Sequence, residues 1–261
     1  MMDHPAGAGI LPPGTEGSPL TGAPKHRFFV LPEILAGAPP ALLGGSVVHL
    51  PPDISRQLYT VLRLRPGARV LLLDGSGWED LAELVDARGD AQILERRLAA
   101  GEPRLHLTLY AALLKGQHLE WVLQKGTELG VCAFVPIVTR RTVVRDLSRV
   151  RKKQARWARI LREAAEQCRR ARVPILSDPL SFADACREAA SGHDRAFLPT
   201  TQTRGRSLAE VACGTPPERA ALLIGPEGGF DEAEVRLALD CGIQPVSLGP
   251  RTLRAETAAL A

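Results

Sequence analysis

The C-terminal part of the sequence alternates short apolar runs with segments of helical periodicity, and this alternation restricts the fold more than any other feature. Residues 105–114 alternate apolar and polar side chains and are predicted to form a strand. Residues 117–129 place apolar side chains, including Leu129, on one helical face, and Gly130 is the predicted end of that helix. Residues 131–138 are a second apolar run. A strand, a helix and a strand in succession imply a parallel pair, because parallel strands need a long crossover connection.

Two more apolar runs, 220–224 and 246–248, continue this pattern. The segment between them has Asp231 and Glu234 at the spacing of a helix capping box. Residues 104–261 are therefore expected to fold as an α/β domain built on a parallel sheet.

The N-terminal part is expected to contain mainly β-structure. Short apolar runs bounded by turn residues predict strands, and one segment with apolar residues three or four positions apart predicts a short helix. The predicted strands are residues 68–73, 81–85 and 91–98, and the predicted helix is residues 53–64. We interpret residues 25–98 as a small β-barrel and residues 99–103 as a linker. Residues 1–24, rich in Pro and Gly, are interpreted as a flexible leader.

Composition excludes several classes of protein. The chain has 261 residues, of which 45% are hydrophobic and 24% charged, as in ordinary globular proteins. No apolar run approaches the roughly 18 residues that cross a membrane, and the N-terminus lacks the pattern of a secretory signal. We therefore expect a cytoplasmic protein without a membrane partner. The five cysteines and six histidines are scattered along the chain, so no metal site is expected.

Positive charge is concentrated in one segment. Residues 139–173 contain thirteen Arg or Lys and three acidic residues, a net charge of +10 in a chain whose total is +4. Arg supplies 28 of the 33 basic residues, and its planar guanidinium suits phosphate groups. A basic stripe on an otherwise acidic body is typical of proteins that bind nucleic acid. The alternative is a solvated helix face in a proteome rich in arginine.

Residues 149–171 of this basic segment are predicted to form a helix. The apolar residues of the helix fall on one stripe and comprise Trp157, Ile160, Leu161, Ala164 and Cys168. The arginines expected to be more exposed are Arg156, Arg159, Arg162 and Arg170. Cys168 is interpreted as a core residue of the helix rather than a nucleophile.

Two glycine-led loops each follow a predicted strand. The first, residues 225–229 (GPEGG), precedes a helix, and glycines there allow backbone amides to approach a ligand closely. Gly228 is the position at which we expect a positive φ. The second loop, residues 248–254, adds Arg251 and Arg254. Two such loops at one sheet edge would form a ligand crevice at the carboxyl ends of the strands. The alternatives are tight turns, and arginines that pair with Glu227 or Glu256.

Several motifs together identify a family. In chain order they read HRFF at 26–29, VLRLRPG at 61–67, LLDGSG at 72–77, KGQHLEWVLQKGTELGV at 115–131, EQCRRARVP at 166–174, LIGPEGGF at 223–230 and LGPRTLRAET at 248–257. The sequence resembles the bacterial 16S ribosomal RNA uridine N3-methyltransferases (ribosomal RNA small subunit methyltransferase E), which belong to the knotted SPOUT class. The resemblance covers nearly all of the chain after the leader, although this sequence ends only a few residues into the family's last helix.

The resemblance implies a PUA-like β-barrel that binds RNA, followed by a SPOUT domain whose chain threads a trefoil knot. It also implies a homodimer, 16S rRNA or the small ribosomal subunit as partner, and S-adenosylmethionine as cofactor. The cofactor positions that it implies are Leu198, Pro199, Ile224, Gly225, Pro226, Glu227, Gly228, Gly229, Leu248, Gly249, Pro250, Arg251 and Leu253.

The implied reaction is methyl transfer to N3 of a uridine. N3–H is a weak acid, so the site must favour the deprotonated base. Arg254 or Arg170 could stabilise the developing negative charge, and Glu256 or Glu227 could accept the proton. Candidate RNA contacts are Arg27, Arg63, Lys115, Lys125, Arg140, Arg156, Arg159 and Arg169.

Three other functions are alternatives to this reaction. One is a ribosome-assembly protein that binds RNA on the same fold without catalysis. Another is a knotted methyltransferase that acts on tRNA. A Rossmann-type cofactor enzyme is disfavoured, because neither glycine-led loop contains the dinucleotide fingerprint or a P-loop.

Overall fold

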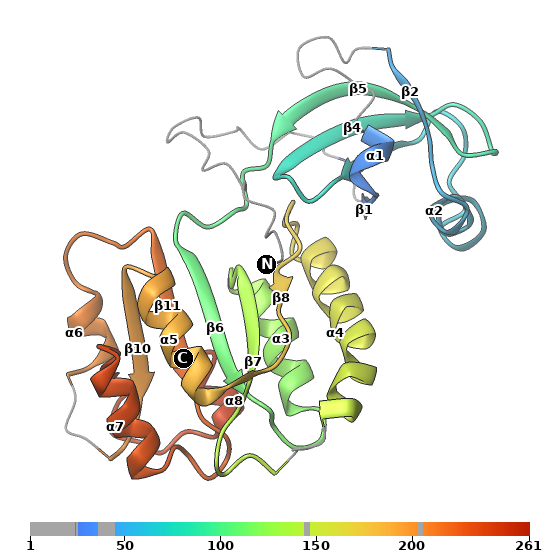
Figure 1. Ribbon diagram of the computed structural model, residues 1–261. Coiled ribbons are helices and arrows are strands. Elements are labelled where there is room, and N and C mark those ends of the chain that lie inside the picture. Colours follow the sequence, from blue (N-terminus) through green and yellow to red (C-terminus); the bar gives the residue numbers. More distant parts are fainter. Residues whose placement is uncertain (1–23, 25, 36–44, 144–146, 203–205) are drawn as a thin grey trace, which may run out of the picture.

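The computed structural model describes residues 24, 26–35, 45–143, 147–202 and 206–261, and its strands form two separate sheets (Figure 1). The N-terminal sheet has five strands in the order β1-β3-β4-β5-β2. Its elements are β1 (Arg27–Phe29), α1 (Pro32–Leu35), β2 (Val47–His49), α2 (Pro52–Arg56), the π-helical turn η1 (Gln57–Val61), β3 (Arg69–Leu73), β4 (Trp78–Leu84) and β5 (Asp90–Leu98). Strands β1 and β3 are parallel and the other pairs antiparallel.

The three strands predicted in this part are confirmed, although β4 begins three residues earlier than expected. The predicted helix over residues 53–64 is shorter, because it widens into a π-helical turn and ends at Val61. Among the described residues the strand order is an open path, with no pair between β1 and β2.

The C-terminal sheet is parallel throughout, as predicted, with the order β12-β10-β11-β6-β7-β8 and β9 also paired to β7. Its strands are β6 (His106–Ala112), β7 (Ala133–Val138), β8 (Ile175–Leu176), β9 (Leu180–Ser181), β10 (Arg195–Pro199), β11 (Arg219–Ile224) and β12 (Gln244–Val246). Its helices are α3 (His118–Glu128), α4 (Leu147–Gln167), α5 (Phe182–Gly192), α6 (Leu208–Ala212), α7 (Glu232–Asp240) and α8 (Ala255–Ala258).

Helices cover both faces of this sheet, and strand β6 shows why. Leu109 and Ala111 pack in the cluster that includes α3, α4 and α8, whereas Tyr110 and Ala112 pack in the cluster of α5 and α7. Successive side chains of a strand point to opposite faces, so a central strand covered on both sides must be apolar on both.

The local helix signals act as predicted at most positions. Asp231 and Glu234 form a complete capping box at the start of α7. Gly130, with φ +98°, follows the end of α3. The assignment of Leu129 to the buried face of α3 is wrong, because it lies beyond the last helical turn and is 67% exposed.

The N-terminal sheet lies between its own helices and the end of α4. One face packs on side chains such as Leu35, Ile54 and Leu58. The other face contributes Phe29 and Leu73 to a small cluster with residues from α4 and the segment after it. This second contact joins the two sheets into one structure.

Candidate active site

Three neighbouring parallel strands end at the same edge of the C-terminal sheet. Strand β10 lies between β11 and β12, and Pro199 at the end of β10 pairs with Val246 at the end of β12. The two glycine-led loops therefore leave the same edge of the sheet, one on each side of β10, which confirms the predicted shared edge. Leu198 and Pro199 lie at this edge as well, in the last two residues of β10.

The first loop is a tight turn. The backbone amide of Gly229 donates to the carbonyl oxygen of Pro226 at 2.8 Å, and Gly229 has φ +67°. A Cβ atom at Gly225 would lie 3.2 Å from the ring of Phe230, so the chain has little room for a side chain there. The expectation of a positive φ at Gly228 is wrong, because the left-handed residue of this turn is its neighbour Gly229.

Side chains from other loops hold this turn in place. The guanidinium of Arg141 donates to the carbonyl oxygen of Gly228 at 2.6 Å, and Gln202 donates to that of Phe230 at 2.5 Å. Glu227 accepts a hydrogen bond from the backbone amide of Lys115 at 3.0 Å. Within the described part of the chain, the backbone amides of Glu227 and Gly228 donate no hydrogen bond, so they remain available to a ligand.

The second loop leads directly into α8. Gly249 has φ +110°, and Arg254 is the N-cap residue of α8, with its side chain exposed. Neither Arg251 nor Arg254 forms an ion pair with Glu227 or Glu256, the alternative considered for both. Arg254 therefore keeps its guanidinium available at the carboxyl edge of the sheet.

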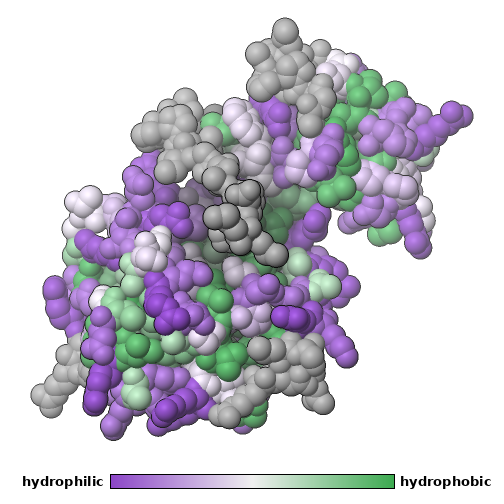
Figure 2. Space-filling model, viewed as in Figure 1, coloured by the Kyte–Doolittle hydropathy of each residue, from purple (hydrophilic) through white to green (hydrophobic). Residues whose placement is uncertain are grey.

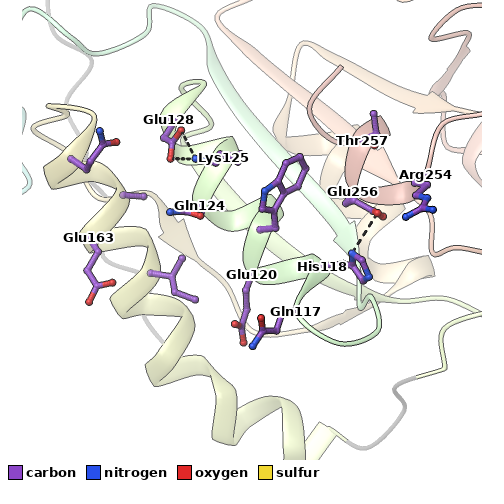
Figure 3. A pocket seen from close by; sticks show the side chains of 14 residues that line it. Gln117, His118, Glu120, Gln124, Lys125, Glu128, Glu163, Arg254, Glu256 and Thr257 are labelled. Atoms are coloured by element: carbon purple, nitrogen blue, oxygen red, sulfur yellow. Dashed lines mark hydrogen bonds and ion pairs between the residues drawn. The ribbon is translucent and has the colours of Figure 1, made fainter.

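Glu256 pairs with a histidine that the sequence analysis did not single out. In Figure 3 the carboxylate of Glu256 points toward His118 of α3, at 3.4 Å from Nδ1, and Arg254 lies beside them. His118 follows Lys115 by three residues, so the same short segment contacts both glycine-led loops. The sequence signal for His118 was its place in the family motif KGQHLEW. As one of six histidines scattered along the chain, it gave no further indication of a role.

His118, Arg254 and Glu256 line one end of a groove of about 1130 Å³ between α3, α4 and α8. The lining of the groove is acidic on balance, with four carboxylates against Lys125 and Arg254; the carboxylates belong to Glu120, Glu128, Glu163 and Glu256. Its one large exposed apolar side chain is Trp121, which is 44% exposed. An acidic lining repels phosphate, so this groove does not suit an RNA backbone.

The expectation that Arg170 is exposed is wrong, and its surroundings do not favour the catalytic role predicted for it. Arg170 lies beyond the end of α4 and is 4% exposed. Its guanidinium donates to the backbone oxygens of Thr127 and Val131 and pairs with Glu102. Val131 precedes β7, so Arg170 lies at the amino edge of the parallel sheet, opposite the glycine-led loops.

The surroundings of Arg27 do not favour the RNA contact predicted for it. Its side chain is 8% exposed and pairs with Glu79 of β4 at 2.5 Å, and Glu79 also pairs with Arg97. A guanidinium buried in such an ion pair is not accessible to a phosphate group of RNA.

The other proposed RNA contacts divide into two groups. Lys125 pairs with Glu128, Arg156 with Glu120 and Arg140 with Asp231, so acidic neighbours offset their charge. Arg159 also has an acidic neighbour, Glu163, at 3.6 Å. Arg63, Lys115 and Arg169 are exposed, and Arg63 and Arg169 have positive φ values of 54° and 66°.

Cys168 shows no sign of activation, because burial raises the pKa of its thiol. Among the described residues, no three His, Cys, Asp or Glu side chains form a group able to hold a metal ion. No helix in the described part of the chain is long and apolar enough to cross a membrane.

Comparison with known proteins agrees with this arrangement. A family model described as an RNA methyltransferase domain matches residues 101–261. Ribosomal RNA small subunit methyltransferase E from Synechocystis is 38% identical over 88% of this chain and 75% of its own length. The protein of the same name from Bacillus subtilis is 34% identical over 90% of this chain and 93% of its own length.

Two solved structures share the fold. Ribosomal RNA small subunit methyltransferase E from Neisseria gonorrhoeae, bound to S-adenosylmethionine, has a TM-score of 0.76 and 31% identity, covering 92% of this chain and 94% of that chain. A putative methyltransferase from Legionella pneumophila in complex with S-adenosylmethionine has a TM-score of 0.75 and 31% identity. The match covers 90% of this chain and 93% of that chain. From its fold, its loops and these relatives, the chain belongs to the ribosomal RNA small subunit methyltransferase E family.

Proposed function

We propose that this protein transfers a methyl group from S-adenosylmethionine to N3 of a uridine in the 16S rRNA of the small ribosomal subunit, in the cytoplasm. The observation that carries the proposal is the pair of glycine-led loops at one sheet edge, with Arg254 and Glu256 directly after the second loop. Relatives named for this activity, 38% and 34% identical, support the substrate class.

The carboxyl edge of the sheet fits the cofactor. The turn at residues 225–229 offers the unused amides of Glu227 and Gly228, and Gly225 and Gly229 keep the backbone free of side chains. Residues 248–253 and the end of β10, Leu198 and Pro199, would complete the binding site. When bound, S-adenosylmethionine supplies a methyl group activated by a sulfonium.

The protein's own residues must hold the uracil as an anion. The exposed guanidinium of Arg254 would donate hydrogen bonds to a uracil carbonyl oxygen, where negative charge develops as N3 loses its proton. Glu256, oriented by His118 at 3.4 Å, would accept that proton. Glu227 is a weaker candidate for the base, because one of its oxygens already accepts from the amide of Lys115.

Three further features of the family form part of this proposal. The N-terminal sheet would be a PUA-like domain, residues 25–98, that binds RNA. Residues 104–261 would form a SPOUT domain with a knotted chain, which the pairing of Ser247 with residues 206–208 supports. The protein would be a homodimer, as the family resemblance implies.

The test is methylation of defined RNA. The protein, labelled S-adenosylmethionine and 16S rRNA from a strain that lacks this gene are incubated, and the modified nucleotide is mapped by mass spectrometry. We expect one N3-methyluridine in 16S rRNA and none in tRNA. RNA binding without transfer would support the assembly-protein alternative, and transfer only to tRNA would support the other knotted methyltransferase class.

A further inference from the structure

Helix α4 separates two surfaces of opposite charge. The side that faces α3 and α8 is the acidic groove, where Arg156 is paired with Glu120 at 2.7 Å. The other side faces the segment around β8. Along it, Arg151, Ala155, Ala158 and Arg162 follow one another at three- and four-residue spacing, and so form one stripe of the helix.

A second, smaller cleft runs along this other side of α4. It has a volume of about 480 Å³ and is lined by residues that include Ala155, Ala158, Arg159, Arg162, Pro174 and Leu176. The alanines leave space above the helix, while the proline and leucine form an apolar wall. Pockets of roughly 300–1,000 Å³ hold small organic ligands, so a nucleoside fits this volume.

The rim of the cleft is basic. Arg159 is 69% exposed at its side chain, and its carboxylate neighbour, Glu163, lies 3.6 Å away with a side chain 65% exposed. An exposed pair at this separation contributes little energy and can be replaced by a phosphate. Arg162 donates to the backbone oxygen of Phe29 through one nitrogen.

Two other carboxylates lie close to the cleft. Glu166 accepts a hydrogen bond from the amide of Phe29 at 3.3 Å, and burial raises the pKa of its carboxyl group. Asp178 accepts from Gln154 at 2.7 Å. Figure 2 shows one face of the molecule, on which hydrophilic residues predominate and hydrophobic patches lie between them.

We propose that the cleft between α4 and the β8 segment binds an unstacked base of the RNA substrate, with Arg159 and Arg162 holding the phosphates beside it. The apolar wall would cover the base, and the two guanidinium groups would match the negative backbone. This inference rests on the proposed function and adds a second point of RNA contact to it.

The bound base would not be the methylated one. The cleft lies beside the C-terminal half of α4, whereas α4 begins just after the carboxyl edge of the sheet that carries the glycine-led loops. Position 159 is twelve residues from the start of α4, which corresponds to about 18 Å along a helix. The RNA would therefore run along α4 from the N-terminal sheet toward the glycine-led loops.

Two variants test the contact with the base and the contact with the phosphates separately. Ala158→Leu fills the cleft without a change of charge, and leucine is a strong helix former at this exposed position. It should weaken the affinity for a 16S rRNA fragment roughly 5- to 150-fold, as the loss of one stacked base does, with the salt dependence unchanged. Arg159→Ala should weaken binding and lower the slope of log affinity against log salt by about 0.7.

Two matched controls lie on the acidic side of the same helix. Gln167→Leu adds a similar apolar side chain in the acidic groove, and Arg156→Ala removes an arginine paired with Glu120. Both should bind RNA as the unaltered protein does. Circular dichroism checks that all four variants are folded.

Binding is measured without cofactor, so the outcome is independent of methyl transfer. RNA affinity unchanged in Ala158→Leu, or lowered equally in Gln167→Leu, would overturn the cleft assignment, even if the protein methylates RNA. RNA binding that depends on the cleft in a protein without transferase activity would leave the cleft in place and overturn the proposed function. A protein that binds no RNA would contradict both.

Discussion

At the scale of single residues, the proposed chemistry depends on side chains that stay exposed and form no ion pair with other described residues. Arg254 is such a residue, because it caps α8 with its side chain exposed, whereas Arg170 uses its guanidinium on two backbone oxygens and Glu102. The two arginines were equivalent candidates in the sequence, and burial distinguishes them.

Arg254→Lys tests this chemistry, since lysine keeps the charge and loses the planar fork. We expect methyl transfer to slow by about 10²–10³-fold, with the affinities for RNA and S-adenosylmethionine retained. Single-turnover methylation at saturating RNA and cofactor measures the rate, and Arg236→Lys at an exposed position of α7 is the control. Near-normal rates in Arg254→Lys would make Arg254 a structural residue.

In the turn at residues 225–229, substitutions at the adjacent Gly228 and Gly229 test which glycine cofactor binding requires. Gly229→Ala places a side chain at φ +67°, which costs about 1–2 kcal/mol and should disturb the turn and weaken cofactor binding. Gly228→Ala should be milder, because the new Cβ meets only the flexible side chain of Arg141, at 3.2 Å. Gly229→Asn should recover part of the affinity, since asparagine tolerates this region. Calorimetric titration would contradict this account if the Gly228 variant lost more affinity than the Gly229 variant.

At the scale of elements, the N-terminal sheet buries charge where its strands pair. Asp80 of β4 is 2% exposed and lies 3.4 Å from Arg96 of β5. Its Oδ2 atom has no hydrogen-bond partner among the described residues. Burial raises the pKa of Asp80 to about 6, although Arg96 opposes the shift.

This pKa predicts how stability depends on pH. Because the folded pKa of Asp80 lies above its ordinary value of 3.8, its contribution is fully present below that value and is lost as the pH rises through about 6. The slope attributable to this group is at most about 1.4 kcal/mol per pH unit. Asp80→Asn should remove this pH dependence of the unfolding free energy between pH 4 and 7 in urea unfolding, whereas Glu83→Gln, at a half-buried position of the same strand, should leave it unchanged. The same slope in both variants would assign the effect to other groups.

At the scale of the whole molecule, one joint connects the two sheets. Glu102 accepts from Arg170 and from the backbone amides of Ala171 and Arg172, and it lies just after the N-terminal sheet. Arg172 in turn donates to the backbone oxygen of Ser76 in the turn between β3 and β4. The N-terminal sheet is thereby held beside the end of α4, next to the part of the helix that lines the proposed RNA cleft.

Removal of Arg170 should weaken this joint. Arg170→Met leaves the carbonyl oxygen of Val131 without its donor and removes the ion pair with Glu102, which should cost about 1–3 kcal/mol of unfolding free energy. The carbonyl oxygen of Thr127 keeps the amide of Gly130, and Glu102 keeps the amides of Ala171 and Arg172. The exposed neighbour Arg169→Gln should cost little. Urea denaturation measures both. The methyl-transfer rate per folded Arg170→Met molecule should stay near normal at low temperature, and a large loss of rate without loss of stability would restore the catalytic assignment.

The sequence by itself determined the features that depend on near neighbours. The period of apolar residues placed the strands β6 and β7 and the helix α3 between them, and the spacing of Asp231 and Glu234 determined the capping box of α7. The common edge of the glycine-led loops followed as well, because parallel strands end together.

Only the tertiary structure decided which charges remain available. Arg27 is paired with Glu79, 52 positions away, and Arg170 with Glu102, 68 positions away. Likewise, His118 reaches Glu256 only because α3 and α8 pack on the same face of the sheet. A count of charges along the chain treats every arginine alike, whereas burial and pairing depend on strands and helices that meet only when the chain has folded.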